Sequence, residues 1–362
     1  MSKIEIQTSS KQYPVWVGFD ILSTLPEQIE LLGTISSILV IVDETVQGLH
    51  LPTLLNVLPK ENHVYVVPNG EGCKTFSVYE EVLTFALEKR LDRKSLVIAF
   101  GGGAVGDLAG FVASTYMRGI PFIQVPTTLL AHDSAVGGKV AINHKLGKNM
   151  IGQFHQPVAV VYDLNFLKTL PEEEWLSGFG EVIKHSMLDE HHFYEELKDE
   201  CRSISDLQSS KMKEFIKKGI HVKNRIVTKD ERETSVRAFL NFGHTFGHSL
   251  EKEVGYGKIR HGEAVVTGIL FALYLSKKHL NLSFDLDELF QWMKKLGYSF
   301  EIPNLEFDAL YHHMLGDKKT INGEITFVLL KQIGEPVLLK LSKSNLSEAF
   351  NWLTDLCRGG EE

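Results

Sequence analysis

Five short apolar runs, separated by helical stretches, constrain the fold of the first half of this chain. Each run is apolar throughout, which is typical of strands that are buried on both faces of a parallel sheet. The runs cover residues 37–43, 63–68, 95–100, 122–126 and 158–163. Helical patterns lie between several of them, for example over 75–90. This alternation predicts a parallel sheet covered by helices, with the opening segments IEIQT and YPVWVG as an added hairpin.

After about residue 171 the sequence becomes helical in character. The segments that begin at Pro171, Asp189, Ser209 and His261 carry the 3.6-residue hydrophobic period of helices. One exception, 324–340, predicts a β-hairpin that turns near Gly334 and Glu335. We therefore predict two domains, an α/β domain over 1–170 and a helical domain over 171–362.

Composition narrows the class of protein. The chain has 362 residues and a net charge of -8, which argues against a nucleic-acid partner. No apolar run reaches the ~18 residues of a membrane span, and the first residues show no signal region, so we expect a cytoplasmic protein without a membrane partner. The three cysteines, Cys73, Cys201 and Cys357, are widely spaced, which predicts reduced thiols rather than disulfides.

A group of histidines and one glutamate predicts a metal site. His244 and His248 are four residues apart and would share one face of a helix. His261 follows in a glycine-broken stretch, and Glu181 lies upstream in an apolar run. Three imidazoles and a carboxylate suit a catalytic zinc-type site, which has three protein ligands and an open position. The spacing leaves open which two histidines bind.

Glu181 and Lys184 lie one helical turn apart and would share a helix face. The apolar neighbours Phe179, Val182 and Ile183 predict that this pair is partly buried. A buried carboxylate needs a metal or a cation beside it.

A glycine-rich turn, 101–107, follows a predicted strand and opens a helix. Such a turn lets backbone N–H groups approach a phosphate, although its spacing differs from G-x-G-x-x-G and a plain strand–helix connection explains it equally well. Asp43, Thr127 and Thr128 end other strands, and residues 69–74 form a polar loop at a strand end. Because α/β sheets bind ligands at this edge, a dinucleotide is the favoured interpretation.

Glycines beside lysines recur in 133–139 and 143–149. Backbone groups and a lysine charge in such segments suit a phosphate or carboxylate. The alternative is an ordinary polar surface loop.

Long motifs follow one another over about residues 13 to 340. They include GGGAVGDLAGFVASTYMRG, VPTTLLAHDSAVGGKVAINHKLGKNMIGQF, FLKTLPEEEWLSGFGEVIKH, DERETSVRAFLNFGHTFGHSLE, RHGEAV and DKK. With these motifs the chain resembles the 3-dehydroquinate synthase family of sugar phosphate cyclases. The resemblance implies a Rossmann-like, NAD-binding α/β domain at the N-terminus, an α-helical metal-binding domain at the C-terminus, and a homodimer.

The resemblance also implies roles for individual residues. The metal ligands would be Glu181, His244 and His261, which leaves His248 to contact the substrate's phosphate. His248, Lys184, Asp133 and Glu233 would form the catalytic group. The implied substrate contacts are Arg118 (across the dimer), Lys139, Asn149, Lys223, Arg237, Asn241, Lys318 and Lys319. The implied NAD contacts are Asp43, Glu71, Lys74, Gly103, Ala104, Val105, Gly106, Asp107, Thr127, Thr128, Lys139, Lys148, Phe166, Leu167, Lys168 and Thr169.

The implied reaction converts 3-deoxy-D-arabino-heptulosonate 7-phosphate to 3-dehydroquinate and phosphate, with NAD+ and a zinc or cobalt ion as cofactors. NAD+ would take a hydride and return it, so the reaction has no net redox change. Three alternatives stay open: a cyclase that makes an inosose or valiolone, a metal-dependent polyol dehydrogenase, and a non-catalytic NAD- or metal-binding protein. Lys139, Arg237 and Asn241 favour dehydroquinate, because the other cyclase substrates lack a carboxylate.

Overall fold

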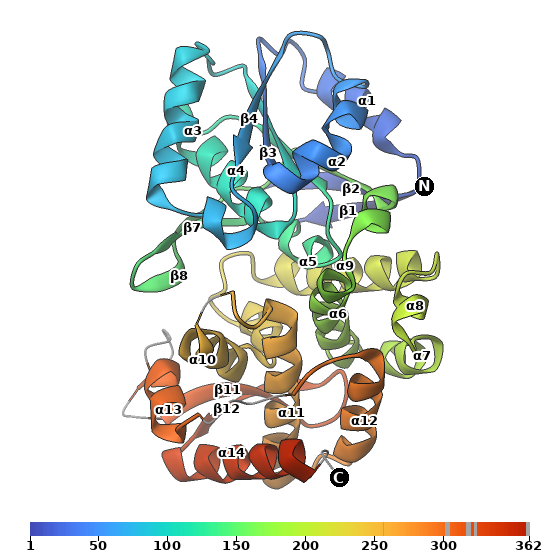
Figure 1. The fold of residues 1–362 in the computed structure, drawn as a ribbon, viewed down its shortest axis with the longest axis vertical. Helices are drawn as coiled ribbons and strands as arrows, with labels where there is room; N and C mark the ends of the chain where they lie inside the picture. Colours follow the sequence, from blue (N-terminus) through green and yellow to red (C-terminus); the bar gives the residue numbers. More distant parts are fainter. Residues whose placement is uncertain (256, 301–304, 316–319, 322–323, 360–362) are drawn as a thin grey trace. The chain divides into compact units, whose positions relative to one another are not determined.

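The structure, a computed structural model, describes residues 1–255, 257–300, 305–315, 320–321 and 324–359. The chain forms two compact units (Figure 1), the first made of Met1–Pro171 with Lys223–Arg232 and the second of Glu172–Val222 with Glu233–Glu362. The sequence assigned NAD binding to 1–170 and metal and substrate binding to 171–362, and these functional assignments stay predictions. Among the described residues, no helix is both long and apolar enough to cross a membrane.

A seven-stranded sheet forms the centre of the first unit, with the strand order β1-β2-β9-β6-β5-β3-β4. Every neighbouring pair is parallel except β1 and β2, which form the predicted hairpin. Its strands are β1 (Ser2–Gln7), β2 (Gln12–Gly18), β3 (Ile38–Asp43), β4 (Asn62–Val67), β5 (Leu96–Gly101), β6 (Phe122–Pro126) and β9 (Ala159–Asp163). The predicted α/β class is confirmed.

Helices cover both faces of the sheet at its central strands, which explains why β3, β5, β6 and β9 are buried along their whole length. In β3, Leu39 and Ile41 pack with α3 (Phe76–Glu88) and α4 (Gly103–Thr115). Val40 and Val42 pack on the other face, with α1 (Leu25–Glu30) and α2 (Glu44–Leu55). Figure 1 shows the two helix pairs on opposite sides of β3 and β4. Alternate side chains of one strand therefore enter two separate cores.

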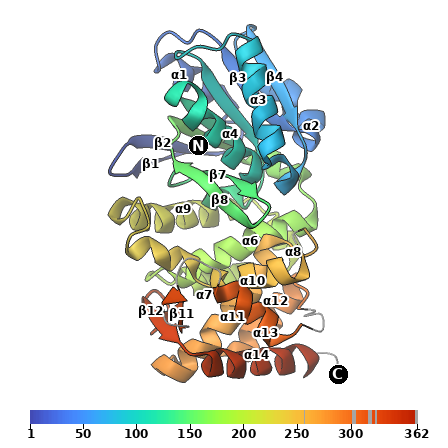
Figure 2. The ribbon, with the colours of Figure 1, turned by 90° about the vertical axis from the view of Figure 1, so that its left-hand side faces the viewer.

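A second, small sheet includes residues 143–149, for which a polar surface loop was the alternative interpretation of the sequence. Strands β7 (Lys139–His144) and β8 (Gly147–Phe154) form an antiparallel hairpin beside α4 (Figure 2). Val140 and Ile142 are buried in the core that contains α4, whereas β8 is largely exposed. The sequence did not predict this hairpin. Only β7 carries enough apolar residues for a strand pattern, and the turn is rich in glycine and lysine.

The second unit is helical around one long central helix, α11, which packs against α6, α10, α14 and β11. Its helices are α6 (Glu172–Met187), α7 (Phe193–Glu200), α8 (Ile204–Leu207), α9 (Met212–Lys229), α10 (His244–Val254), α11 (His261–Leu280), α12 (Leu286–Leu296), α13 (Phe307–Leu315) and α14 (Lys343–Arg358). The strands β10 (Thr320–Ile321), β11 (Glu324–Leu330) and β12 (Pro336–Leu341) form a sheet that contains the predicted hairpin. In α9, residues 223–229 belong to the first unit.

The short helices complete the chain. They are α5 (Ala131–Ser134) and the 3-10 helices η1 (Leu22–Thr24), η2 (Gly70–Cys73), η3 (Tyr116–Arg118), η4 (Leu164–Thr169) and η5 (Val236–Asn241). Several of the predicted site residues lie in these short helices, among them Glu71, Arg118, Asp133, Arg237 and Asn241.

Glu231 holds the segment 223–232 to the rest of the first unit. Its buried carboxylate accepts hydrogen bonds from the hydroxyls of Ser9 and Ser10, from the Ser10 amide at 2.9 Å and from the Gln156 side chain at 2.8 Å. Burial alone would raise the pKa of Glu231, but the hydrogen bonds outweigh it and lower the pKa to about 2.

Replacing Glu231 should therefore change the acid stability of the chain. The wild-type carboxylate has a folded-state pKa below its ordinary value of 4.5, so its stabilisation is complete above that pH and is lost as the pH falls toward 2. We expect Glu231→Gln to lower the free energy of unfolding by about 1–3 kcal/mol near neutral pH. Urea unfolding should show a smaller difference from wild type at about pH 3. The exposed Glu30→Gln is the control, and a pH-independent loss for Glu231→Gln would contradict the assignment.

Candidate active site

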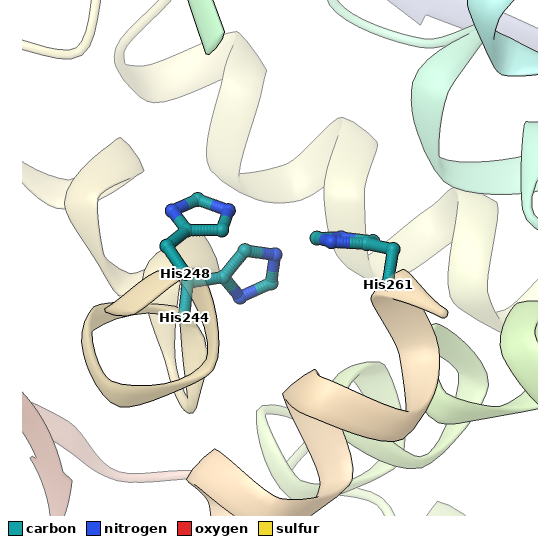
Figure 3. A group of neighbouring side chains, drawn as sticks. All are labelled: His244, His248 and His261. Atoms are coloured by element: carbon teal, nitrogen blue, oxygen red, sulfur yellow. The ribbon is translucent and has the colours of Figure 1, made fainter. Parts of the chain in front are cut away.

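Three histidine rings of the second unit point toward one another, two from α10 and one from the start of α11 (Figure 3). The ring centroids of His244 lie 5.2 Å from His248 and 5.3 Å from His261, and His248 lies 5.7 Å from His261. One nitrogen of each ring lies within 4.8 Å of the others. Ring positions alone therefore leave the choice of ligands open.

The carboxylate of Glu181, on α6, distinguishes the rings. Its Oε1 lies 3.3 Å from Nε2 of His244 and 3.1 Å from Nε2 of His261. A tetrahedral zinc ion with bonds of ~2.0–2.1 Å separates its ligand atoms by roughly 3.3–3.4 Å. Both oxygen-to-nitrogen distances are close to this separation, so Glu181 could share a divalent ion with each of the two histidines. The ligand set Glu181, His244 and His261 stays a prediction that this geometry supports.

Charges around Glu181 keep its carboxylate ionised. Burial alone would raise the pKa of Glu181, but Lys184, with which it forms a buried ion pair, and the two histidines lower it well below its usual range. Burial lowers the pKa of His244, against the attraction of Glu181. Burial would also lower the pKa of His261, but hydrogen bonds to Glu181 and Glu251 raise it to about 9. The group therefore combines an ionised carboxylate with two imidazoles that face it.

Glycines next to the candidate ligands let the helices approach closely. Gly180 precedes Glu181 and Gly262 follows His261. A Cβ atom on Gly262 would lie only 1.8 Å from the carbonyl oxygen of Ser177 on α6, and one on Gly180 would lie 2.6 Å from the carbonyl oxygen of Gly262. The backbones of α6 and α11 thus touch where they carry Glu181 and His261.

The same arrangement holds between α10 and α11. Gly243 and Gly247 precede His244 and His248. A Cβ atom on Gly247 would lie 2.8 Å from the carbonyl oxygen of Ala264. A glycine beside every candidate ligand is a signal in the sequence that the motif reading did not use.

Sequence reasoning also missed the groups behind the histidines. Nδ1 of His261 lies 3.2 Å from Oε2 of Glu251, and Nδ1 of His244 lies 3.1 Å from the carbonyl oxygen of Phe242. The signal was present, because residues 244, 248 and 251 follow the i, i+4, i+7 pattern of one helix face.

Three further predicted site residues, Arg237, Asn241 and Glu233, lie in the second unit near η5. Arg237, in η5, is only 1% exposed. The Asn241 side chain donates a hydrogen bond of 2.7 Å to Glu233, whose backbone has a left-handed φ of 57°. Lys318 and Lys319 lie outside the described residues.

In the first unit, the glycine turn has buried hydroxyls around it. A Cβ atom on Gly102 would lie 2.9 Å from Cγ2 of Thr128, and one on Gly103 would lie 2.8 Å from Oγ of Ser134. The hydroxyl oxygens of Thr127, Thr128 and Ser134 are buried, and none has a hydrogen-bond partner in the described part of the chain. Buried hydroxyls at the start of α4 suit the phosphates of a dinucleotide. Ser134 was not predicted.

Predicted NAD and substrate contacts form one network on this unit. The ammonium group of Lys74, 1% exposed, donates to Asp107 at 2.6 Å and to Asn149. Burial raises the pKa of Asp107, and Lys74 opposes that rise. Glu71 pairs with Lys148 at 3.3 Å. Lys74 thus connects Asp107, at the start of α4, to Asn149 on the β7–β8 hairpin.

Other predicted NAD contacts lie at strand ends. Asp43 caps α2 by accepting a hydrogen bond of 2.9 Å from the Val46 amide, and burial raises the pKa of its carboxyl group. Ala104, Val105 and Gly106 form the first turn of α4 with Gly103 and Asp107. Phe166, Leu167, Lys168 and Thr169 lie in η4, which follows β9.

The remaining predicted residues of this unit are cations and one acid. The ammonium group of Lys223 lies 3.1 Å from Oδ1 of Asp133 and also donates to its backbone carbonyl. Lys139, at the start of β7, is exposed. Arg118 is also exposed, and it has a left-handed φ of 72° next to Met117, whose φ is 48°.

Two family models match consecutive parts of this chain. They are described as 3-dehydroquinate synthase N-terminal, over residues 64–177, and 3-dehydroquinate synthase C-terminal, over residues 178–320. A 3-dehydroquinate synthase of Bacillus mycoides is 50% identical over 353 residues, which cover 97% of this chain and 98% of the relative. A 3-dehydroquinate synthase of Geobacillus thermodenitrificans is 48% identical over 368 residues and covers 99% of both chains.

Solved structures share the fold over nearly the full length. A 2-deoxy-scyllo-inosose synthase, crystallised with carbaglucose-6-phosphate, NAD+ and Co2+, superposes with a TM-score of 0.86 at 26% identity. The match covers 96% of this chain and 98% of that chain.

Proposed function

This chain belongs to the 3-dehydroquinate synthase family, and we propose that it converts 3-deoxy-D-arabino-heptulosonate 7-phosphate to 3-dehydroquinate and phosphate. The reaction is a phosphate-eliminating cyclisation of the shikimate pathway, which leads to chorismate and the aromatic amino acids. The main structural observation in favour of this metal-dependent reaction is the position of Glu181. Its Oε1 lies 3.3 Å from Nε2 of His244 and 3.1 Å from Nε2 of His261.

The donor set of the second unit would hold a divalent metal through Glu181, His244 and His261. When bound, the metal would lower the pKa of the substrate hydroxyl to be oxidised, and NAD+ would accept the hydride and later return it. Lys184 keeps Glu181 ionised. His248, whose ring lies beside both histidines, would face the substrate's phosphate and hold or move a proton there.

The first unit would hold NAD+ at the carboxyl ends of its parallel strands. The buried hydroxyls of Thr127, Thr128 and Ser134 can donate hydrogen bonds to phosphate oxygens. The N–H groups at the N-terminus of α4 lie at the positive end of the helix dipole and would also attract a phosphate. Asp43, at the end of β3, offers a carboxylate to ribose hydroxyls. Lys74 neutralises Asp107 so that this acid does not repel the phosphates.

Cationic and amide side chains would bind the substrate's carboxylate and phosphate groups. Arg237 would receive the carboxylate, because its fork of donors matches that group. Asn241 is oriented by Glu233. Lys139, Asn149 and Lys223 are assigned contacts to the substrate as well. Such groups would hold the substrate in place while each step proceeds.

We propose a cytoplasmic homodimer. Arg118 supports the second part of this proposal, since its side chain is exposed and its backbone is held in a conformation that non-glycine residues rarely adopt. Strain of this kind is typical of functional positions, and Arg118 would serve the site of the partner subunit. Mixing a His261→Ala chain with an Arg118→Ala chain should restore part of the activity that each lacks alone.

The direct test is phosphate release from the heptulosonate phosphate. We expect release by the metal-loaded enzyme with NAD+, and loss of release after the metal is removed with a chelator or after bound NAD+ is removed. The absorbance of NADH should not accumulate, because the hydride is returned. Accumulation of NADH with a polyol would identify a dehydrogenase, and turnover of a hexose phosphate without a carboxylate would identify an inosose-type cyclase.

Arg237 provides a specificity prediction. Arg237→Lys keeps the charge but loses the fork, and we expect KM for the heptulosonate phosphate to rise about 10–100-fold, since a hydrogen bond to a charged group contributes ~1.5–3 kcal/mol. An analogue with a hydroxymethyl group in place of the carboxylate should be handled equally by wild type and variant. Unchanged KM and kcat with the natural substrate would refute this role.

A further inference from the structure

We propose that Glu251 is a positioning residue for the metal ligand His261. The inference rests on the proposed function, in which His261 binds a divalent metal, and it extends that function to a side chain behind the ligand. Glu251 lies near the end of α10 and is 4% exposed. Its Oε2 lies 3.2 Å from Nδ1 of His261.

The two nitrogens of His261 face two different carboxylates. Nε2 faces Glu181 Oε1 at 3.1 Å, on the side of the predicted metal, and Nδ1 faces Glu251. A nitrogen that binds a metal carries no proton, so the proton of the neutral ring lies on the other nitrogen. Glu251 accepts a hydrogen bond from that N–H group, which fixes both the tautomer and the plane of the ring.

The two predicted histidine ligands have different partners at Nδ1. His244 has an uncharged partner for Nδ1, the carbonyl oxygen of Phe242 at 3.1 Å. His261 has a charged one, and a charged acceptor makes the stronger hydrogen bond and a more basic imidazole. His261 is the first residue of α11, and its partner Glu251 comes from the neighbouring helix α10.

The location of Glu251 is unfavourable for stability by itself. A carboxylate in the last turn of a helix meets the negative end of the helix dipole, and burial removes its hydration. Placements that break such local rules are expected at functional sites. Because residues 244, 248 and 251 share one face of α10, the helix presents Glu251 beside the two histidines and toward the start of α11.

The test is the affinity for Zn2+ alone, measured by competition with a chromophoric chelator. We expect Glu251→Ala to weaken zinc binding about 10–100-fold, and Glu251→Gln to weaken it less, because glutamine keeps an oxygen acceptor without the charge. The matched control is Glu253→Gln on the same helix, whose carboxylate pairs with His313 at 2.8 Å, and it should bind zinc as the wild type does.

A second readout separates positioning from folding. The visible spectrum of the Co2+-substituted protein should change in Glu251→Gln, since the ligand ring is no longer held by a carboxylate, while the melting temperature of the metal-free protein stays close to that of wild type. If Glu251→Ala does not fold, Glu251→Gln carries the test. Wild-type zinc affinity and an unchanged Co2+ spectrum in Glu251→Gln would overturn the proposal. Both readouts are independent of phosphate release, so a failure of the proposed reaction is seen separately.

Discussion

His261→Ala should bind zinc more than about 100-fold more weakly than wild type and should release no phosphate from the heptulosonate phosphate. The reason is geometric, because Nε2 of His261 and Nε2 of His244 both lie within 3.3 Å of the same oxygen of Glu181. Without one imidazole, a divalent ion would keep only two protein ligands. Metal content after dialysis against a chelator of known affinity measures the first effect.

The matched variant is His248→Ala. Its ring lies 5.2 Å from His244 and 5.7 Å from His261, yet the proposed ligand set does not include it. We expect it to keep wild-type zinc affinity and to lose turnover by about 10²–10⁴-fold, the usual contribution of a general acid or base. The reverse pattern, zinc lost in His248→Ala and kept in His261→Ala, would show that the neighbouring pair on α10 binds the metal.

Gly262→Ala should cause the largest loss of stability among single-methyl substitutions in the metal-binding group. The new Cβ would lie 1.8 Å from the carbonyl oxygen of Ser177, so α11 and α6 must separate. Overpacking that moves a backbone lowers the free energy of unfolding by about 3 kcal/mol. Urea unfolding in the presence of a chelator measures this loss without the contribution of bound metal.

The same substitution should weaken zinc binding, because Gly262 follows His261 and touches the helix that carries Glu181. The control is Gly48→Ala in α2, where a Cβ would meet nothing within 4 Å. Alanine in that exposed helical position should raise stability by up to about 1 kcal/mol. Equal effects of the two substitutions would show that the contact between α6 and α11 does not position the ligands.

Much of the fold could be predicted from the sequence, because strand and helix patterns are local. The strands β3, β5, β6 and β9 begin within one residue of the apolar runs that predicted them. Their uniform apolar character follows from burial on both faces, as Leu39 and Val40 show by entering opposite cores. The β7–β8 hairpin could not be predicted in this way, since its outer strand is mostly exposed and carries no apolar alternation.

For the candidate site, the order of residues along the chain shows which side chains are available: one apolar-flanked glutamate, three histidines and a glycine beside each of them. The spacing left open which two histidines bind, because a spacing of four residues describes only one helix, and the family resemblance implied His244 and His261. The packing of three helices places Glu181 opposite His244 and His261, and Glu251 on the other side of the His261 ring. These contacts join residues up to 80 positions apart on three helices. Their distances depend on how closely the helix backbones approach at Gly180 and Gly262, which is a property of packing and not of any local pattern.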